Sequence, residues 1–473
     1  MDAVSEHHLL RRLAFDNPWW DFSSDTEIRF RHPPKRAFYP AFAEQVLARE
    51  TGEALVLAGS RGTGKTVMIR QMIAQLIESG VAPRSILYVG MTTTSYIFKE
   101  LDQLFGLFCA RHGHQPTASL YVFFDEAQYG RDWRTALTAL ARALPRTRFV
   151  AAVSAEAPAL TPREAPDGMT VQILPPLTFV EFLRFRGNEE KLFGPGAGKP
   201  QGKAVFRETA LALLNAEFHR YVNFGGFPEG ILHSSTDAPA PTFIRDTLID
   251  RVLHRDLAGL AGISDTRELN RLFVELALNS GREVGIESLA KTTGIAKNTV
   301  RKYLTFLEHA FLIRRVDRVD GKAKRFQRAV TFKAYLTSPS LHAALFGPSD
   351  VEGEDFPGLA ETALAAQWPY DADAGELVYA SWRRGRVDLL SLDGESGKPD
   401  KVFEMDWGNR YATPGEKPQD LVKFISSTNP EAAGHILTRS LARPGILRGV
   451  ELKLVPVSLY CYLLLRDRLR PPE

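Results

Sequence analysis

The chain has few cysteines, no long apolar run and almost no net charge, and each shortage excludes a class of protein. Its 473 residues include two cysteines, Cys109 and Cys461, which are too few for a disulfide framework or a cysteine-based zinc site. With 59 basic and 56 acidic residues the formal net charge is +3, so the chain is not a polycation, although a local basic face is still allowed. No apolar run approaches the roughly 18 residues that a membrane span needs. We therefore expect no membrane partner. Because the N-terminus lacks the layout of a signal peptide, we expect a cytoplasmic location.

One eight-residue segment matches the phosphate-binding pattern G-x-x-x-x-G-K-[ST]. Its predicted nucleotide-binding residues are Gly59, Ser60, Arg61, Gly62, Thr63, Gly64, Lys65 and Thr66. An apolar run over residues 54–58 precedes it, and an amphipathic stretch from Val67 to about Ile77 follows it. The segment thus lies between a buried strand and the start of a helix, where its mechanism requires it. The alternative is a glycine-rich turn that only happens to end in Lys-Thr.

The parts of this segment have separate roles in holding a triphosphate. Glycines allow a tight turn whose backbone N–H groups face the β-phosphate, and the helix N-terminus adds partial positive charge. We expect Lys65 to reach the β- and γ-phosphates, and the Thr66 hydroxyl to bind Mg²⁺.

A second motif, residues 120–126, supplies two carboxylates at the end of an apolar strand. In open α/β sheets ligands bind at the carboxyl ends of the strands. We expect Asp125 to bind Mg²⁺ through water, and Glu126 to act as the general base for water attacking the γ-phosphate. Alone, the pair is equally typical of an acidic helix N-cap, but a phosphate loop about 60 residues upstream favours one shared site.

Further strands over residues 85–90 and 148–154, with a helix over 133–144 between the acidic strand and the last strand, predict a doubly wound α/β fold with a parallel sheet. Ser154 ends its strand beside the expected γ-phosphate. It is either a polar sensor of nucleotide state or a turn or cap serine. Arg131, Arg163 and Arg184 are candidate arginine fingers, but the sequence does not choose among them and favours a surface or structural role for any one of them.

Five motifs follow one another in an order that resembles one family. They are residues 17–20 (Asn-Pro-Trp-Trp), 59–66, 124–128 (Phe-Asp-Glu-Ala-Gln), 174–182 (Leu-Pro-Pro-Leu-Thr-Phe-Val-Glu-Phe) and 225–229 (Gly-Gly-Phe-Pro-Glu). The chain resembles, over nearly its whole length, the archaeal-type AAA+ ATPases of prokaryotes that carry a C-terminal domain of uncharacterised function. The phosphate loop and the acidic strand are common to all P-loop ATPases, whereas the last two motifs are much more specific. The resemblance implies ATP as the nucleotide and a small helical lid before residues 225–229. It leaves a homo-oligomer open.

Residues 256–335 have the pattern of a winged helix-turn-helix. Helical spacing covers 268–278, a second helix fits 286–292, and a third, 297–308, follows a turn at Gly294. Strands over 311–316 and 328–336 predict a wing rich in Arg and Lys. The expected contacts with duplex DNA are Lys297, Asn298, Arg301 and Lys302. The alternative is a winged helix that only packs against the ATPase module.

The last region, residues 336–473, has an acidic pattern similar to that of PD-(D/E)xK nucleases. Glu361 lies on an expected helix over 359–367, and Asp388 and Glu404 lie on expected strands, so the three are candidates for a second metal site. Asp406 stands two residues after Glu404, where those nucleases have lysine, and this adds negative charge and removes the cation. Lys401, Lys423 and Arg410 are candidate substitutes. The alternative is a nuclease-like fold retained as a docking module for a protein partner.

These patterns divide the chain into an N-terminal extension (1–35), an AAA+ P-loop core (36–190), a helical lid and linker (191–255), a winged helix-turn-helix (256–335) and a degenerate nuclease-like domain (336–473). The best linker candidate is 194–202. We expect a Mg²⁺-dependent ATPase whose nucleotide state drives DNA binding or a switch. Two alternatives are an ATP-gated nuclease and a regulator that binds ATP without hydrolysing it.

Overall fold

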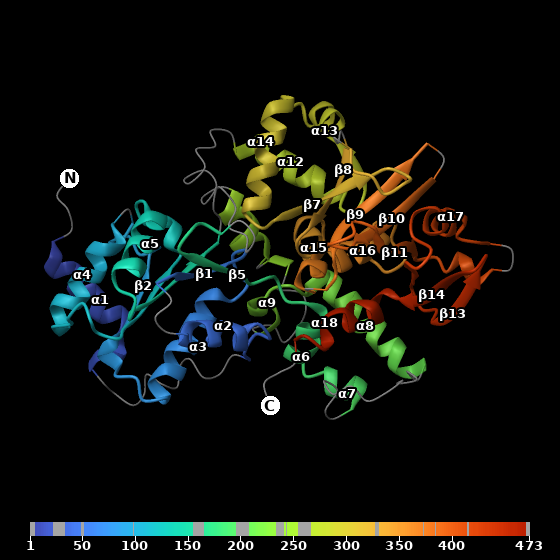
Figure 1. Ribbon diagram of the computed structural model, residues 1–473. Helices are drawn as coiled ribbons and strands as arrows, with labels where there is room; N and C mark the ends of the chain where they lie inside the picture. Colours follow the sequence, from blue (N-terminus) through green and yellow to red (C-terminus); the bar gives the residue numbers. More distant parts are fainter. Residues whose placement is uncertain are drawn as a thin grey trace.

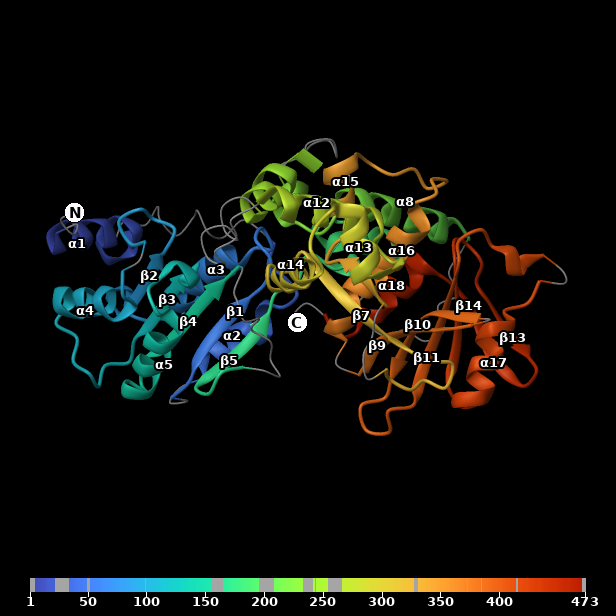
Figure 2. The same cartoon turned by 90° about the horizontal axis from the view of Figure 1, so that it is seen from above.

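The computed structural model describes residues 5–21, 34–48, 52–97, 99–154, 165–194, 208–232, 241–242, 244–253, 266–326, 331–371, 373–383, 385–413 and 416–469. Two β-sheets organise this part of the chain (Figure 1). One lies in the N-terminal region and has five strands, and the other lies in the C-terminal half and has nine. Figures 1 and 2 both show the helix α14 (Lys297–His309) between the two sheets.

The N-terminal sheet is parallel throughout, in the strand order β2-β3-β4-β1-β5. Its strands are β1 (Ala54–Ala58), β2 (Ile86–Gly90), β3 (Tyr121–Asp125), β4 (Arg148–Val153) and β5 (Met169–Ile173). The first four confirm the strands expected from the sequence. Every residue of β1, β3 and β4 is buried, which explains why these strands read as continuous apolar runs.

Helices cover this sheet and complete its core. They are α1 (Glu6–Asp16), α2 (Tyr39–Leu47), α3 (Lys65–Glu78), α4 (Leu101–His112) and α5 (Trp133–Ala143), with short 3-10 turns η1 (Pro18–Asp21), η3 (Pro83–Ser85) and η4 (Ala127–Tyr129). The helix expected after the phosphate-loop pattern is α3, and the helix expected over 133–144 is α5. Strand and helix alternate through this region, which confirms the predicted α/β class.

The Asn-Pro-Trp-Trp motif covers the open edge of this sheet at β2. The Asn17 side chain donates to the Tyr88 carbonyl at 2.8 Å and accepts from the Tyr88 N–H at 2.6 Å, as a neighbouring strand would. The indole N–H groups of Trp19 and Trp20 both donate to the Ile86 carbonyl. The motif thus satisfies backbone groups that an edge strand otherwise exposes.

A helical region connects the two sheets. It contains α6 (Phe179–Phe185), α7 (Glu189–Phe193), α8 (Glu208–Phe224), α9 (Pro228–Leu232) and the π-helical segment η6 (Ile244–Ile249). Thr178 and Glu181 form a capping box at the start of α6. The expected linker lies outside the described residues except for Gly194.

Three helices at the positions of the expected helix-turn-helix follow: α12 (Thr266–Leu278), α13 (Ile286–Thr293) and α14. Gly294, with φ of 74°, ends α13 in the left-handed conformation and allows the turn into α14. The strands β6 (Glu283–Gly285), β7 (Ile313–Val319) and β8 (Thr331–Leu336) accompany these helices.

These three strands belong to the same nine-stranded sheet as the strands of the C-terminal region. The order is β13-β14-β12-β11-β10-β9-β7-β8-β6, and β7 pairs in parallel with β9. The C-terminal strands are β9 (Glu376–Trp382), β10 (Gly385–Leu392), β11 (Pro399–Asp406), β12 (Ala433–Thr438), β13 (Arg443–Leu447) and β14 (Val450–Pro456). The sheet therefore continues across the boundary expected near residue 335.

The C-terminal region also contains helices and 3-10 turns. They are α15 (Ser340–Phe346), α16 (Phe356–Gln367), η8 (Trp368–Tyr370), η9 (Arg410–Ala412), α17 (Gln419–Thr428) and α18 (Val457–Arg466). The expected helix over 359–367 and the strands that carry Asp388 and Glu404 are present as α16, β10 and β11.

Side chains from outside α12–α14 enter the apolar core of these three helices. Phe227, which precedes α9, and Leu248 of η6 are both 1% exposed and share one buried cluster with Leu272, Phe273 and other residues of α12–α14. A single core therefore joins the segment after α8 to the three helices.

Candidate nucleotide-binding site

The site begins with the register of the N-terminal sheet. Strand β4 lies between β1 and β3, with Ala58 opposite Val153 and Asp125 opposite Ala152. The residues that follow these strand ends are Gly59, Ser154 and Glu126. The structure therefore brings the phosphate-loop pattern, the acidic pair and Ser154 to one edge of the sheet, as the sequence predicts.

The phosphate-loop segment forms a turn in which Lys65 donates hydrogen bonds to the backbone of the same segment. The buried Lys65 ammonium donates to the carbonyls of Gly59 at 2.8 Å and Ser60 at 2.9 Å. The Thr63 hydroxyl also donates to the Ser60 carbonyl, at 2.9 Å. Gly64 is the N-cap of α3 and has a left-handed backbone. As at the start of every α-helix, the first backbone N–H groups of α3 have no partners within the helix. This arrangement favours an anion at the helix N-terminus.

Thr66 and Asp125 make a direct contact. The Thr66 hydroxyl donates to Asp125 Oδ2 at 2.7 Å, and the Tyr88 hydroxyl donates to the same oxygen at 3.0 Å. The other carboxylate oxygen, Oδ1, is buried and has no hydrogen-bond partner. A hydroxyl beside a carboxylate oxygen that lacks a partner fits Mg²⁺, which prefers oxygen ligands and retains several waters.

The charge of Asp125 depends on the groups around it. Burial, followed by the negative charge of Glu126, raises the pKa of Asp125 above its ordinary value, against hydrogen bonds from Thr66 and Tyr88. A divalent cation at Oδ1 would reverse this balance, because it favours the ionised carboxylate.

Glu126 is held at both carboxylate oxygens. Ser154 Oγ donates to Oε1 at 2.6 Å, Gln128 Nε2 donates to Oε2 at 2.6 Å, and the Arg61 guanidinium lies 3.7 Å from Oε2. The backbone of Glu126 is left-handed, with φ of 55°, a conformation that is uncommon for a residue other than glycine and is found at functional sites. Burial alone would raise the pKa of Glu126, but the charges of Lys65 and Arg61 and the two hydrogen bonds lower it overall. Glu126 is therefore ionised at neutral pH, as a general base must be.

A pocket of about 400 Å³ opens over these groups. The residues that line it come from five segments of the chain and are Pro34, Arg36, Arg61, Gly62, Gly64, Lys65, Thr66, Val67, Gln71, Glu126, Phe185, Pro228 and Glu229. The Gly-Gly-Phe-Pro-Glu motif thus reaches the pocket through Pro228 and Glu229. From the sequence we expected this motif to be no more than a structural corner after the lid.

The same motif and η6 lie directly on the loop. Gly62 has a φ of 79°, and a Cβ atom there would lie 3.0 Å from Leu248 Cδ2 and 3.5 Å from Phe227 Cδ1. Gly62 is therefore needed both for its left-handed backbone and for this close approach. Since Leu248 and Phe227 belong to the core of α12–α14, the predicted phosphate loop touches that core.

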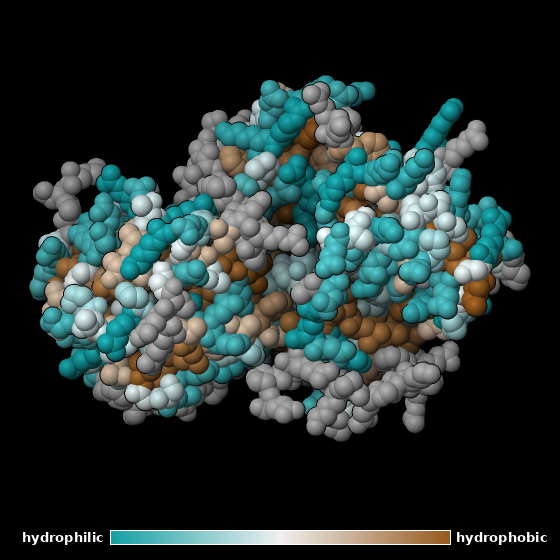
Figure 3. Space-filling view, viewed as in Figure 1, coloured by the Kyte–Doolittle hydropathy of each residue, from teal (hydrophilic) through white to brown (hydrophobic). Residues whose placement is uncertain are grey.

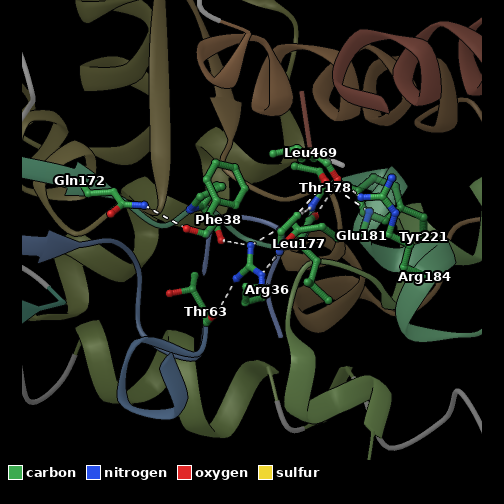
Figure 4. A network of polar contacts seen from close by, with 12 residues as sticks. Arg36, Phe38, Thr63, Gln172, Leu177, Thr178, Glu181, Arg184, Tyr221 and Leu469 are labelled. Atoms are coloured by element: carbon green, nitrogen blue, oxygen red, sulfur yellow. Dashed lines mark hydrogen bonds and ion pairs between the residues drawn. The ribbon is translucent and has the colours of Figure 1, made fainter. Parts of the chain in front are cut away.

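Sequence reasoning assigned no role to Arg36 or Glu181, which form a buried ion pair beside the loop (Figure 4). Arg36 Nε donates to Glu181 Oε1 at 2.8 Å and Nη2 donates to Oε2 at 3.0 Å, while Nη1 donates to the Thr63 carbonyl at 2.5 Å. The specific Pro-Leu-x-Phe-x-Glu-Phe motif was the only sequence signal that pointed to Glu181.

Neither of the two candidate arginine fingers that the structure describes lines the pocket. Arg131 is exposed and pairs with Glu100 and Asp132. Arg184 pairs with Glu189 at 2.6 Å and donates to the Leu469 carbonyl. Arg163 lies outside the described residues.

The four expected DNA contacts are all exposed, on the first turns of α14. Lys297 pairs with Glu287, the Arg301 guanidinium donates to Asn298 Oδ1 at 2.9 Å, and Lys302 lies over the Phe306 ring. Figure 3 shows mostly hydrophilic residues at the top of the molecule, where α13 and α14 lie in Figure 1. This end of α14 therefore faces solvent rather than the N-terminal sheet.

The three C-terminal carboxylates have separate partners. Glu361 accepts from the buried Lys333 ammonium at 2.7 Å, Asp388 Oδ2 accepts from the Met405 N–H at 2.8 Å, and Glu404 accepts from Arg410 at 2.6 Å. Glu361 and Asp388 line one pocket of about 370 Å³, and Lys333 lines it too. Burial raises the pKa of Glu361 despite the charge of Lys333.

Within the described ranges, no group of three or more His, Cys, Asp or Glu side chains is placed to hold a metal ion. The structure therefore does not bring Glu361, Asp388 and Glu404 together as metal ligands. In the part of the chain that the structure places, no helix combines the length and the apolar character that a bilayer crossing demands.

Residues 51–183, which contain the phosphate-loop pattern, the acidic pair and Ser154, match a family model described as an AAA domain. This match and the geometry above support a nucleotide-binding P-loop ATPase domain in the N-terminal region. Residues 215–352 match a second model, described as a domain of unknown function, DUF8612.

Similar chains include an uncharacterized protein of Haemophilus influenzae, 24% identical over 284 residues, and one of Methanocaldococcus jannaschii, 24% identical over 324 residues. The matches cover 59% and 63% of this chain, and 66% and 65% of the two relatives, just under two thirds of their length.

A comparison with solved structures found two chains of low similarity. PCH-2 of C. elegans is 13% identical, with 42% of this chain and 61% of that chain covered and a TM-score of 0.27. AMPPCP-bound DnaA of Aquifex aeolicus is 12% identical, with 57% and 86% covered and a TM-score of 0.27.

Proposed function

We propose that the protein binds and hydrolyses ATP with Mg²⁺, and that its nucleotide state controls duplex DNA binding or a switch in its C-terminal half. The observation that carries hydrolysis is the contact of Thr66 with Asp125 at 2.7 Å, beside an Asp125 oxygen without a partner and an ionised Glu126 at the same pocket. A protein that only stores ATP does not need a carboxylate base at this position.

The roles follow from the chain's own groups. Backbone N–H groups of the loop and the N-terminus of α3 hold the phosphates, and Lys65 exchanges its carbonyl partners for phosphate oxygens. Thr66 and Asp125 would hold Mg²⁺, which when bound neutralises charge that develops on the phosphates. Glu126 takes the proton from the attacking water, and Ser154 and Gln128 orient its carboxylate.

The contact of Gly62 with Phe227 and Leu248 supports coupling to the helix-turn-helix. A phosphate bound in the loop would lie close to Gly62, and the neighbours of Gly62, Phe227 and Leu248, belong to the core of α12–α14. Because packed cores adopt discrete arrangements rather than deform continuously, a small shift at the loop can reposition α14 as a unit.

The test is ATP turnover by the full chain with and without Mg²⁺ and duplex DNA. We expect Mg²⁺-dependent phosphate release that DNA stimulates, with a stimulation that falls steeply as salt rises. The double variant Lys297→Ala/Arg301→Ala should lose the stimulation and keep the basal rate. If DNA does not change turnover at any salt concentration, coupling to DNA is rejected. The proposal is then reduced to a nucleotide-controlled switch in the C-terminal half.

A second candidate is a nuclease site at the C-terminal pocket, which Glu361 and Asp388 line without Glu404, and the described residues include no ready-made metal cluster there. The sequence lacks the nuclease lysine at Asp406, but Lys333 of β8 places an ammonium 2.7 Å from Glu361 and 3.0 Å from the Asp388 carbonyl. Incubation with supercoiled DNA, Mg²⁺ or Mn²⁺ and ATP tests this candidate. Cleavage that is lost in Asp388→Ala supports it, and intact DNA under every condition rejects it.

A further inference from the structure

Arg36 connects three segments at the nucleotide pocket. It precedes α2, its side chain is 3% exposed, and it lines the pocket beside the loop. Besides Glu181, its guanidinium donates to the carbonyls of Thr63 in the loop and Pro175 after β5, the latter at 2.9 Å. Figure 4 shows Arg36 between Thr63 and Glu181.

The contact with Thr63 fixes the direction of one peptide group. In a trans peptide the carbonyl and the following N–H point in opposite directions, so a Thr63 carbonyl turned toward Arg36 points the Gly64 N–H the other way. Gly64 is the N-cap of α3, where N–H groups lack helical partners. A charged donor on the carbonyl also polarises the peptide, which makes the Gly64 N–H a stronger donor.

Glu181 in turn fixes Arg36. Its carboxylate accepts the two parallel Arg36 bonds and also bonds from the Ala37 N–H at 2.9 Å and the Thr178 N–H at 3.2 Å. Burial opposes ionisation of Glu181, but Arg36 and these N–H groups lower its pKa overall. The two charges therefore compensate each other, and the pair acts on the loop by geometry more than by net field.

We propose that Arg36 and Glu181 are the positioning pair of the phosphate loop: they hold the peptide between Thr63 and Gly64 so that its N–H donates to the β-phosphate of the bound nucleotide. This inference rests on the proposed function, because it needs a nucleotide at the loop. It also gives a physical reason for the Glu in the Pro-Leu-x-Phe-x-Glu-Phe motif, which lies 145 residues from Arg36.

The test is Arg36→Lys, with the dissociation constants of ATP and ADP measured by calorimetry and kcat measured separately. Lysine keeps the charge but lacks the planar fork, so it cannot serve Thr63, Pro175 and both Glu181 oxygens. Both nucleotides carry the β-phosphate. We therefore expect the dissociation constants of ATP and ADP to rise together by about tenfold, the effect of one lost charge-assisted hydrogen bond, with kcat changed less than about twofold.

Two further variants separate positioning from general destabilisation. Glu181→Gln removes the charged partner with little change of shape and should weaken both nucleotides in the same way, so it serves as a second test if Arg36→Lys folds poorly. Arg186→Lys alters the Arg186–Glu217 pair, 3.1 Å apart, at the other end of α6 and should leave both dissociation constants unchanged. Wild-type affinities in Arg36→Lys, or equal losses in Arg36→Lys and Arg186→Lys, would overturn the positioning role alone. Failure of the wild-type chain to bind ATP or ADP would overturn the proposed function as well.

Discussion

Truncation of Leu248 should disconnect the candidate nucleotide site from the core of α12–α14. Leu248→Ala removes the side chain whose Cδ2 would lie 3.0 Å from a Cβ at Gly62, while Lys65, Thr66 and Asp125 keep their contacts. We expect nucleotide affinity to stay close to that of the wild type. In this variant, nucleotide binding should no longer change the stability of α12–α14.

The stability cost of this truncation follows from burial. Leu248 is 1% exposed, and a buried Leu→Ala change costs about 2–5 kcal/mol, depending on how far the cavity collapses. Leu276→Ala is the matched control, because Leu276 is also 1% exposed in the same core and is not among the nearest neighbours of Gly62. Both variants should therefore lose similar stability.

Amide hydrogen exchange of α12–α14, with and without a non-hydrolysable ATP analogue, distinguishes the two variants. The analogue should slow exchange in the wild type and in Leu276→Ala, but not in Leu248→Ala. If Leu248→Ala retains the full nucleotide-dependent protection, the contact between the loop and this core does not transmit nucleotide state, and the coupling argument is wrong.

Three other predictions concern separate parts of the molecule. Asp125→Asn should raise the Mg²⁺ concentration needed for half-maximal turnover by more than about tenfold, since it removes a charge at the proposed metal site, and an unchanged Mg²⁺ titration would contradict that site. Burial lowers the pKa of His435 to about 4 from an ordinary 6.5. The folded chain therefore keeps His435 neutral at a pH where the unfolded chain protonates it, and the free energy of unfolding falls as the pH drops from 6.5 toward 4. Urea unfolding should therefore show a loss of about 2 kcal/mol between pH 7 and pH 5 that His435→Phe, which removes the titrating group, reduces. Asn17→Ala leaves the backbone groups of Tyr88 without the partners they have at 2.6 and 2.8 Å and should destabilise the N-terminal sheet by about 1–3 kcal/mol, measured as proteolytic susceptibility of this region, whereas wild-type resistance would show that the edge needs no cover.

The sequence predicted the first four strands of the N-terminal sheet and the residues of the candidate site because their signals are local. The loop pattern, the acidic strand and Ser154 each stand at the end of an apolar run, and parallel strands bring such ends to one edge. The pattern alone could not show that Arg36 pairs with Glu181, or that Leu248 touches Gly62, since these contacts join segments far apart in the chain. The conformation of Glu126 and the hydrogen bonds to both its oxygens also required coordinates.

The C-terminal half shows the same division. Alternating and apolar runs predicted the elements that carry Glu361, Asp388 and Glu404, but not the parallel pairing of β7 with β9. That pairing makes one sheet of segments that the sequence assigned to two domains. It also places Lys333 of β8 beside Glu361, so an ammonium comes from a strand outside the expected nuclease-like region. Neither feature leaves a periodic signal in the sequence.

Phosphate release from ATP by the full chain, compared among the wild type, Lys65→Ala and Glu126→Gln, tests the central claim most directly. The account predicts Mg²⁺-dependent turnover in the wild type, loss of nucleotide binding or turnover in Lys65→Ala, and ATP that stays bound and uncleaved in Glu126→Gln. Turnover by Lys65→Ala at the wild-type rate would contradict it.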